Sequence, residues 1–513
     1  MSSLKHSEIL KVLLDNISEV DFREAAGAEE DKEKLKYKDY LVTCCDKLLE
    51  AAECCGFGIC NSRDKVYLFN REYWQRVSNH KFQIFLGASA NKMGLSRNTS
   101  KHYSFREQLM RQLLSVANVY DTDYEDSENC GYYKGSEDSE SSESSCNRDN
   151  RNKVLINLQN GTFEIDGLNM RLKKPQKEDF MTYQLPFKYD EDAVCPIFDY
   201  YLNTVLPDIN NQKILMEYLG YLFIKTRALK LEKSLILYGT GANGKSVLFE
   251  IINALLGGSN NVSNYSLQNL TNENGYYRAM LGNKLVNYAS EINGRMDVSI
   301  FKQLVSGEPV DARLPYGEPF TLSNYGKLIF NCNQLPKTVE HSHAFFRRFL
   351  IIPFDVTIPE ERQDKQLAEK IIKSELSGVL NKVLDGLKRI LKQKSFTHSD
   401  NVDELLNNYK KETNTVSMYV EEMGYESADE FVIASNLYDE YKSFCIHGGY
   451  NPVGKQSFNQ RLKNSGFIIE RRNIGMVAYL KKKNFEEASS QNSQFSQNSE
   501  ASKISNNYSK TVQ

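Results

Sequence analysis

The alternation of apolar and polar residues predicts several compact units separated by polar stretches. Residues 1–118 combine helix-type apolar spacing with one strand-like run, KVYLFNREYWQRV, which contains the single tryptophan, Trp74. This pattern predicts an α/β or α+β domain. Residues 119–150 are rich in Asp, Glu and Ser and almost lack aliphatic side chains. Such a segment cannot offset the entropy lost on ordering, so we predict a disordered linker.

Apolar patterning resumes at VLINLQNGTFEID, whose alternation around Asn160-Gly161 predicts a β-hairpin. A helical domain is predicted over residues 151–230. Four apolar runs, SLILYG, KLVNYAS, KLIFNCN and FLIIPF, then predict strands of a sheet covered on both faces, in an α/β domain over residues 231–395.

The last third of the chain is predicted to hold a helical connection over residues 396–426 and a compact unit over residues 427–484. In that unit the pattern predicts a helix, a turn, a second helix in SFNQRLKNSG and two strands in IIERRNIGMVAYL. Residues 485–513 are polar and repetitive, so we predict a disordered tail.

Composition narrows the setting of the protein. A chain of 513 residues is expected to form three or four units. Its net charge of -3 hides an acidic internal segment and a basic cluster near the C-terminus, so any contact with nucleic acid must be local. The start of the chain does not resemble a secretory signal, and no run approaches the roughly 20 apolar residues that cross a bilayer. We expect a soluble cytoplasmic protein with no membrane partner.

Ten cysteines in a chain of this length are too dilute for a disulfide scaffold. Half of them fall within one short stretch, at Cys44, Cys45, Cys54, Cys55 and Cys60. A zinc site is the alternative there, but the stretch contains neither a CxxC pair nor a histidine. The spacing favours an apolar helix followed by a glycine turn.

The strongest chemical signal is GTGANGKS, which fits the phosphate-binding pattern GxxxxGK[ST]. An apolar strand, SLILY, precedes it and an apolar helix, VLFEIINALL, follows it, so a chance glycine-rich turn is disfavoured. Lys245 is expected to reach the β and γ phosphates of a nucleotide and Ser246 to bind Mg²⁺. The predicted nucleotide-binding residues are Gly239, Thr240, Gly241, Ala242, Asn243, Gly244, Lys245, Ser246 and Val247.

Three further positions extend this site. Glu291 ends the apolar run LVNYASE, where a carboxylate can polarise water and hold Mg²⁺; a surface glutamate is the alternative. Asn333 ends LIFNCN, where an amide can sense the γ-phosphate; a turn-forming asparagine is the alternative. Arg347 and Arg348 precede the last strand, and a guanidinium there can reach across a subunit boundary or simply be solvated.

In this order and spacing, GTGANGKS, LVNYASE, FKQLVSGEPVDARLPYGEPF, LIFNCNQLP and FFRRFLIIPF resemble the superfamily 3 helicase motor of phage and plasmid primase-helicases, with poxvirus primase-helicase as a more distant relative. The resemblance implies an AAA+-like P-loop NTPase core that uses ATP and Mg²⁺. It implies that Lys245, Glu291 and Asn333 are catalytic, and that Arg348, with Arg347 beside it, is the arginine finger. Many such motors carry two acids where this chain has Ser290-Glu291.

DARLPYGEPF predicts a second hairpin, with Pro315, Tyr316 and Gly317 near its tip. In the resembling family this hairpin projects into a ring channel and tracks single-stranded DNA. Lys302, Arg313 and Tyr316 could then supply phosphate contacts and a stacking face. A solvent-exposed hairpin with ordinary charges is the alternative.

The C-terminal unit resembles the winged helix of the same proteins. Residues 455–483 contain eight basic residues and a single acid, Glu470, and this balance favours a DNA-binding surface. The DNA-binding candidates there are Lys455, Arg461, Lys463, Arg471 and Arg472. The resemblance covers roughly residues 150–483. Asp121 and Asp123, the acidic pair considered for a primase metal site, open the predicted disordered segment, so priming is expected from a separate primase or replication-initiation partner.

These observations predict an ATP-dependent replicative DNA helicase of a phage, plasmid or mobile element. It is expected to act on single-stranded and forked DNA as a homo-oligomer, a hexameric ring. Two alternatives remain: a nucleotide-switched, origin-binding initiator or regulator, and a divergent primase-helicase.

Overall fold

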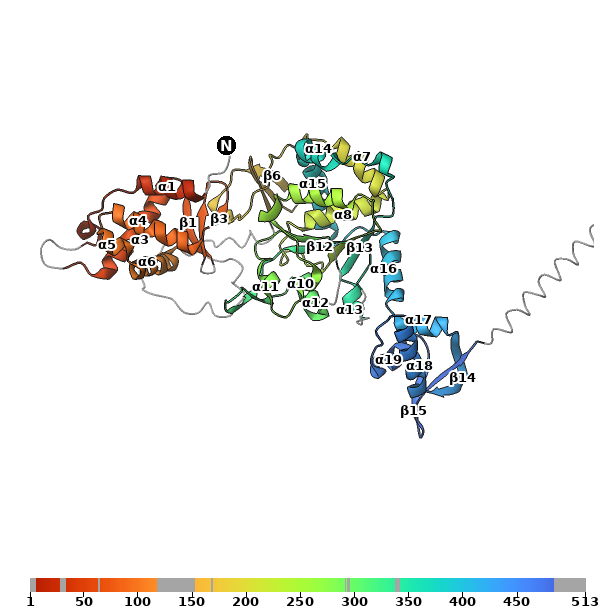
Figure 1. Cartoon of the computed structure of the whole chain (residues 1–513). Coiled ribbons are helices and arrows are strands. Elements are labelled where there is room, and N and C mark those ends of the chain that lie inside the picture. The colour runs from red at the N-terminus through yellow and green to blue at the C-terminus, as the bar shows by residue number, and fades with distance from the viewer. Residues whose placement is uncertain are drawn as a thin grey trace, which may run out of the picture. The chain divides into compact units, whose positions relative to one another are not determined.

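The computed structural model describes residues 6–27, 34–62, 65–117, 153–167, 169–290, 292, 296–336 and 342–483. The chain divides into two compact units, Met1–Gln334 with Ile352–Ser399, and Leu335–Ile351 with Asp400–Gln513 (Figure 1). The predicted linker and the predicted tail lie outside the described residues. No helix of the described part is long and apolar enough to cross a membrane.

The first unit begins with helices that pack on a small antiparallel sheet of order β1-β2-β3. These elements are α1 (His6–Asn16), α2 (Phe22–Ala25), α3 (Tyr37–Cys54), β1 (Gly58–Ser62), β2 (Lys65–Phe69), β3 (Trp74–Arg76), α4 (Asn79–Lys92), α5 (Arg97–Lys101) and α6 (Tyr103–Val116). The single strand predicted in KVYLFNREYWQRV is wrong, because the run forms two strands. The Asn70 side chain accepts hydrogen bonds from the backbone N–H groups of Glu72 and Tyr73, which turns the chain back before Trp74.

The cysteine-rich stretch forms the helix and glycine turn that were predicted. Helix α3 buries Cys44 and Cys45 in the main N-terminal core, and the chain turns at Gly56, whose φ is 70°. Cys60 belongs to a different apolar cluster, with Trp74. Burial raises the pKa of the Cys44 and Cys45 thiols to about 12. Within the described residues no group of three or more His, Cys, Asp or Glu side chains could hold a metal ion.

A second antiparallel sheet, of order β4-β5-β6, follows the undescribed segment. It comprises β4 (Val154–Leu158), β5 (Gly161–Asp166) and β6 (Asn169–Lys173), and a short helix η2 (Lys177–Asp179) comes next. Leu158 pairs with Gly161, which confirms the hairpin at Asn160-Gly161. Strand β6 was not predicted.

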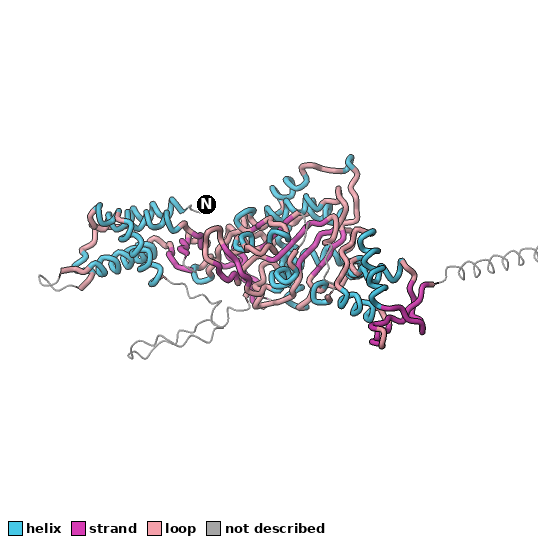
Figure 2. The backbone as a smooth tube through the Cα atoms, turned by 60° about the horizontal axis from the view of Figure 1, so that its bottom comes forward, coloured by secondary structure: helices cyan, strands magenta, loops and turns pink. Residues whose placement is uncertain are grey.

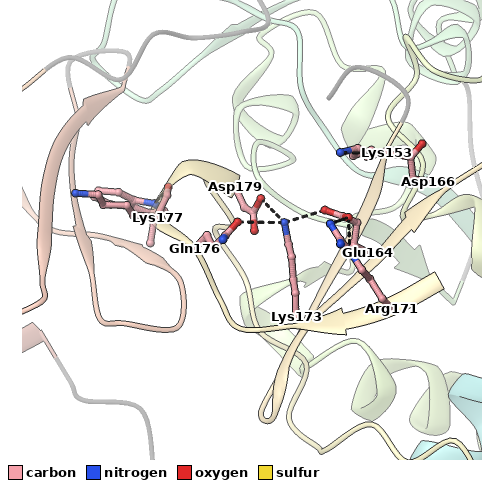
Figure 3. A network of polar contacts seen from close by, with 9 residues as sticks. Lys153, Glu164, Asp166, Arg171, Lys173, Gln176, Lys177 and Asp179 are labelled. Carbon is pink, nitrogen blue, oxygen red and sulfur yellow. Dashed lines mark hydrogen bonds and ion pairs between the residues drawn. The ribbon is translucent and has the colours of Figure 1, made fainter. Parts of the chain in front are cut away.

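Figure 3 shows a polar network between β5, β6 and η2. The Lys173 ammonium lies 2.9 Å from both Glu164 and Asp179, and Arg171 lies 2.6 Å from Glu164. Both carboxylate side chains are nearly buried. Burial alone would raise the pKa of Glu164, but hydrogen bonds from Lys173 and Arg171 outweigh it and lower that pKa. Lys173 and Arg171 therefore favour the charged form of the buried Glu164 carboxylate.

The segment around η2 also contacts the first sheet. The Trp74 backbone N–H donates to the Met181 carbonyl at 2.7 Å, and the Trp74 indole N–H donates to the Lys177 carbonyl at 2.8 Å. The Phe180 ring lies 5.7 Å from the Trp74 ring. Two elements on either side of residues 118–152 therefore share one apolar junction.

A five-stranded sheet has the order β13-β7-β12-β9-β8, in which β7, β12, β9 and β8 are parallel. Its strands are β7 (Ser234–Tyr238), β8 (Val262–Ser263), β9 (Val286–Ala289), β12 (Lys327–Cys332) and β13 (Phe349–Pro353). Figure 2 shows the strands in magenta and the helices in cyan. All four predicted strands are confirmed, and β8 is an addition of two residues. The structure thus has a mixed α/β fold with a parallel sheet.

Helices lie on both sides of this sheet in Figure 1. They are α7 (Pro196–Val205), α8 (Ile209–Tyr221), α9 (Lys245–Leu255), η3 (Gly258–Asn260), α10 (Leu267–Leu270), α11 (Tyr276–Ala279), α12 (Val298–Ser306), η4 (Glu360–Arg362), α14 (Leu367–Ser374) and α15 (Leu376–Gln393). Helices α8 and α15 approach closely, because a Cβ built at Gly386 would lie 2.4 Å from the Met216 backbone. The buried Glu217 carboxylate accepts hydrogen bonds from Arg389 and Thr397 across this contact.

The second unit contains α13 (His343–Phe346), α16 (Asp400–Glu412), α17 (Thr415–Glu422), α18 (Ala434–His447) and α19 (Lys455–Asn464). Its antiparallel sheet has the order β14-β16-β15, with β14 (Tyr425–Ile433), β15 (Ile468–Arg472) and β16 (Gly475–Lys482). The second predicted helix and the two predicted terminal strands are confirmed, since Arg472 pairs with Gly475 at the turn. Strand β14 was not predicted.

Candidate functional site

The glycine-rich loop connects β7 to α9 at the carboxyl end of the parallel sheet. Gly241, Ala242 and Gly244 have φ values of 148°, 49° and 85°, which curl the backbone between strand and helix. Gly244 is the N-cap of α9, and Lys245 is its first residue. The first N–H groups of a helix have no partner within it, so this end of α9 can bind an anion.

Exposure divides the residues of the loop into two sets. Thr240, Gly241, Ala242 and Ser246 are exposed, Val247 and Gly244 are half-buried, and Gly239, Asn243 and Lys245 are buried. The exposed set presents backbone and the two hydroxyl residues Thr240 and Ser246 to solvent, whereas the buried set ties the loop to its surroundings.

The Lys245 ammonium folds back onto its own loop. It donates to the Gly239 carbonyl at 2.6 Å and to the Asn243 side-chain oxygen at 2.9 Å. Burial lowers the pKa of Lys245. The nearby Cys332 thiol has its pKa raised to about 11, chiefly by burial, so it is neutral beside this lysine at ordinary pH. Lys245 must leave these partners to reach a ligand outside the loop.

Neighbouring segments fix the loop. The Asn243 amide donates to the Phe354 carbonyl at 2.9 Å, and the Ile358 N–H donates to the Ala242 carbonyl at 2.7 Å. A Cβ at Gly239 would lie 2.4 Å from the Phe354 carbonyl oxygen. The chain after β13 thus packs directly against the loop, and glycine is required at its first position.

The predicted sensor lies at the same edge of the sheet. Cys332 pairs with Tyr238, and its carbonyl accepts a hydrogen bond of 3.0 Å from the Gly239 N–H. Asn333, the next residue, is exposed and therefore lies beside the start of the loop. Glu291, the predicted catalytic and Mg²⁺-binding carboxylate, lies outside the described residues, two positions after the end of β9 at Ala289.

Arg347 and Arg348 differ in their surroundings although they are adjacent. Arg347 follows α13 and is exposed, whereas Arg348 is 7% exposed and its guanidinium donates to the Ala344 carbonyl. The strand β13 begins at the next residue, Phe349. Either guanidinium could serve a neighbouring subunit, but Arg348 must first leave its contact within α13.

The second predicted hairpin is confirmed. Strands β10 (Val310–Arg313) and β11 (Pro319–Leu322) pair antiparallel. Tyr316 at the tip is fully exposed and has a φ of 60°, while the Arg313 guanidinium donates to the Gly317 carbonyl at 2.8 Å. Lys302 is half-buried on α12. The tip therefore presents an aromatic ring to solvent on a braced turn.

Sequence reasoning missed the residue that anchors this hairpin. The nearly buried Arg278 of α11 donates to the Asp311 carbonyl in β10 at 2.8 Å and to the Leu270 carbonyl at 3.0 Å. An arginine in the short segment YYRA carried no local signal for this role, because its partner in the hairpin, Asp311, lies 33 positions away.

The predicted DNA-binding residues of the second unit lie on α19 and β15. Lys455 and Lys463 are exposed on α19, where Arg461 is half-buried. Arg471 is exposed on β15. Arg472 is held on the sheet, since its guanidinium lies 4.8 Å from the Phe431 ring and bonds Glu470 at 2.9 Å. Helix α19 and the end of β15 therefore each carry exposed basic side chains.

Three family profiles match separate parts of the chain. A profile described as D5 N terminal like matches residues 57–207, and one described as Poxvirus D5 protein-like matches residues 411–502. A family of unknown function, DUF5906, matches residues 237–348, which contain the glycine-rich loop and both arginines.

A protein of Acanthamoeba polyphaga mimivirus named "Putative helicase L207/L206" is 24% identical over 219 residues, covering 40% of this chain. The match spans 22% of that relative's length. The A form apo structure of the NrS-1 C terminal region covers 82% of this chain and 86% of its own, at 13% identity and a TM-score of 0.42. A second NrS-1 structure, of residues 305–718, covers 84% and 98%, also at 13% identity and a TM-score of 0.42.

The fold defines a mixed α/β protein with a glycine-rich loop at the carboxyl end of a parallel sheet. Two D5-type profiles and a relative named as a putative helicase match parts of this chain. In these parts the chain is similar to phage and poxvirus-like primase-helicases.

Proposed function

We propose that this protein is an ATP- and Mg²⁺-dependent DNA helicase with a superfamily 3, AAA+-like P-loop core and a C-terminal winged helix. The observation that carries the proposal is the β7–loop–α9 arrangement, in which exposed backbone at Thr240–Ala242 adjoins a helix N-terminus. That combination of free N–H groups and helix dipole suits a polyphosphate. Lys245 suits the negative charge of the polyphosphate, and the Ser246 hydroxyl suits the metal ion that accompanies it.

Each predicted residue has a role in this reading. Lys245 leaves Gly239 and Asn243 to hold the phosphates, and the exposed Ser246 hydroxyl contributes to the metal site. Glu291 orients water, and Asn333 senses the terminal phosphate. Bound ATP with Mg²⁺ supplies a phosphoanhydride whose hydrolysis changes the charge at the loop.

The arginines support assembly as a hexameric ring. An arginine finger acts on the nucleotide of an adjacent subunit, and head-to-tail contacts of this kind close into rings. Arg348, with Arg347 beside it, is proposed for this role. Because Arg347 is exposed, it is the alternative candidate for the arginine finger, and an experiment must distinguish it from Arg348.

Two surfaces are proposed to hold DNA. The hairpin presents Tyr316 for stacking and Arg313 for phosphate contact on single-stranded DNA, with Lys302 near its base. The basic face of α19 and β15 is proposed to bind duplex DNA at a fork. A separate primase or initiation partner would supply primers.

The test combines ATP hydrolysis, unwinding of a forked duplex and the mass of the oligomer. Wild-type protein should unwind the fork with ATP, and Lys245→Ala should abolish both activities. Lys284→Ala is a matched control, because Lys284 also donates two hydrogen bonds, to the Ser259 and Asn260 carbonyls, and its pKa is also lowered by burial. ATP-dependent oligomers that bind origin DNA without unwinding would refute the helicase and favour an initiator. Template-dependent incorporation of ribonucleotides would instead establish a primase-helicase.

Mixed oligomers test the ring and the finger together. Lys245→Ala subunits keep their arginines, and Arg348→Ala subunits keep their phosphate lysine, so a mixture restores some complete sites between unlike neighbours. Recovered ATPase in the mixture is expected, although each variant alone is inactive. Recovery with Arg347→Ala in place of Arg348→Ala would identify Arg347 as the finger, and no recovery with either would refute action across subunits.

A further inference from the structure

One helix that precedes the five-stranded sheet in the sequence contacts the glycine-rich loop directly. The Tyr201 hydroxyl of α7 donates to the Gly244 carbonyl at 2.9 Å. On the same residue, a Cβ built at Gly244 would lie 2.6 Å from the Val205 Cγ1 atom and 3.1 Å from the Tyr201 ring. Helix α7 therefore lies against Gly244, on the side where the Cβ of any residue other than glycine would lie.

The atom that Tyr201 holds controls the direction of a neighbouring donor. A peptide unit is planar, so the carbonyl of Gly244 and the N–H of Lys245 lie in one plane and point in opposite directions. The Gly244 carbonyl also accepts the hydrogen bond from the Leu248 N–H that opens α9, at 3.1 Å. By fixing this carbonyl, Tyr201 fixes where the Lys245 N–H points and how the first turn of α9 begins.

Helix α7 is itself held firmly at its N-terminus. The Glu375 carboxylate accepts hydrogen bonds from the backbone N–H groups of Ile197 and Phe198, at 2.9 and 2.8 Å. Lys382 of α15 lies 2.7 Å from Asp199. The tyrosine is thus mounted on a helix that other elements position.

Tyr201 is also suited to act as a permanent donor. It is 2% exposed, and burial raises the pKa of its hydroxyl, so the proton stays in place at any ordinary pH. Residue 201 lies within the segment matched by the D5 N terminal like profile, which ends at residue 207. The contact therefore joins that segment to the loop.

We infer that Tyr201 is a positioning residue for the nucleotide site, setting the peptide plane between Gly244 and Lys245 from outside the strand–loop–helix itself. The inference rests on the proposed nucleotide-binding function and deepens it. The orientation of the Lys245 N–H toward a phosphate then depends on the position of α7, so a displacement of α7 changes nucleotide affinity.

A second buried tyrosine provides the matched control. Tyr218 of α8 is 0% exposed, and its hydroxyl donates to the Lys233 carbonyl at 3.1 Å and the Leu328 carbonyl at 2.7 Å. These carbonyls lie at the opposite end of β7 and β12 from the loop. Tyr218→Phe thus removes hydrogen bonds of the same kind without touching the loop.

The experiment compares Tyr201→Phe with Tyr218→Phe in the full chain. Tyr201→Phe should raise KM for ATP about fivefold, the usual effect of losing one hydrogen bond, and change kcat less than twofold. Tyr218→Phe should leave KM unchanged while lowering the unfolding temperature at least as much. Equal KM values for the two variants and wild type would overturn the inference.

A readout without nucleotide keeps the inference testable by itself. Amide hydrogen exchange at Leu248 should be faster in Tyr201→Phe than in wild type and unchanged in Tyr218→Phe, because only Tyr201→Phe removes the hydrogen bond that holds in place the carbonyl to which the Leu248 N–H donates. Unchanged exchange in both variants would refute the positioning role. If exchange behaves as expected but wild type and Lys245→Ala bind ATP equally poorly, the proposed nucleotide function fails and the positioning role of Tyr201 stands.

Discussion

Replacing Gly244 by alanine should damage the loop through two separable effects. The φ of 85° is strained for any residue with a Cβ, which costs about 1–2 kcal/mol. The new methyl group would also lie 2.6 Å from the Val205 side chain, and overpacking of this kind costs about 1–3 kcal/mol. Because Val205 is buried on a fixed helix, little of the overlap can relax cheaply.

Gly258 isolates the first effect. It has a φ of 65°, and no heavy atom lies within 4 Å of a Cβ built there. Gly258→Ala should therefore lose only about 1–2 kcal/mol of unfolding free energy. Gly244→Ala should lose about 1–3 kcal/mol more, divided between stability and nucleotide affinity according to whether the core or the loop moves.

The assay is urea unfolding of both variants together with titration of ATP under one buffer condition. If the loop takes up all of the overlap, the extra loss corresponds to roughly a 5- to 150-fold weaker ATP affinity. The steric argument is refuted if the two variants match each other in both stability and affinity.

Three other perturbations have directions set by the structure. Replacing both Arg313 and Tyr316 by alanine should keep basal ATPase within about twofold and reduce unwinding at least tenfold, since both lie at the exposed hairpin tip. Burial lowers the pKa of Lys327 to about 7, so wild-type stability should rise relative to Lys327→Met between pH 7 and 10. Lys173→Met should cost about 3 kcal/mol at pH 7, because Asp179 loses its ion pair with Lys173 and Glu164 keeps only Arg171; the cost should fall in acid, where Glu164 takes up a proton.

Each of these has an outcome that contradicts it. Glu318→Gln at the hairpin tip is the control for unwinding, and equal loss of basal ATPase in the double variant and in Lys245→Ala would sink the hairpin assignment. A pH-independent stability difference for Lys327→Met, followed by urea unfolding, would mean that the lysine stays charged in the fold. A Lys173→Met deficit that grows in acid would contradict the charge-pairing account of Figure 3.

Features encoded in short stretches could be predicted from the sequence. The strand, loop and helix around Lys245 follow from local apolar patterning and three positive-φ positions, and the hairpin at Asn160-Gly161 follows from its turn residues. Strand β14 could not be predicted, because YESADEFVI contains three acids and becomes a strand only by pairing with β16, where Phe431 meets Tyr479.

Long-range contacts explain what was missed at the site. In the sequence, only the apolar strand that begins after Arg348 favours it over Arg347, and their different exposure arises only when α13 forms and β13 begins. Arg278 and Tyr201 carry no motif, yet one anchors the hairpin and the other holds the loop through partners 33 and 43 positions away.

The junction at Trp74 matters for anyone who trims this protein. A fragment that begins at residue 153 would look natural from composition, but it would lose the indole that covers Phe180 and the donor that satisfies the Lys177 carbonyl. Such a fragment would expose the apolar surface around Phe180 and leave the Lys177 carbonyl without its donor, beside the Lys173 network. A version that keeps α1 to β3 keeps both this junction and the main N-terminal core buried, and it is the better starting point for crystallisation.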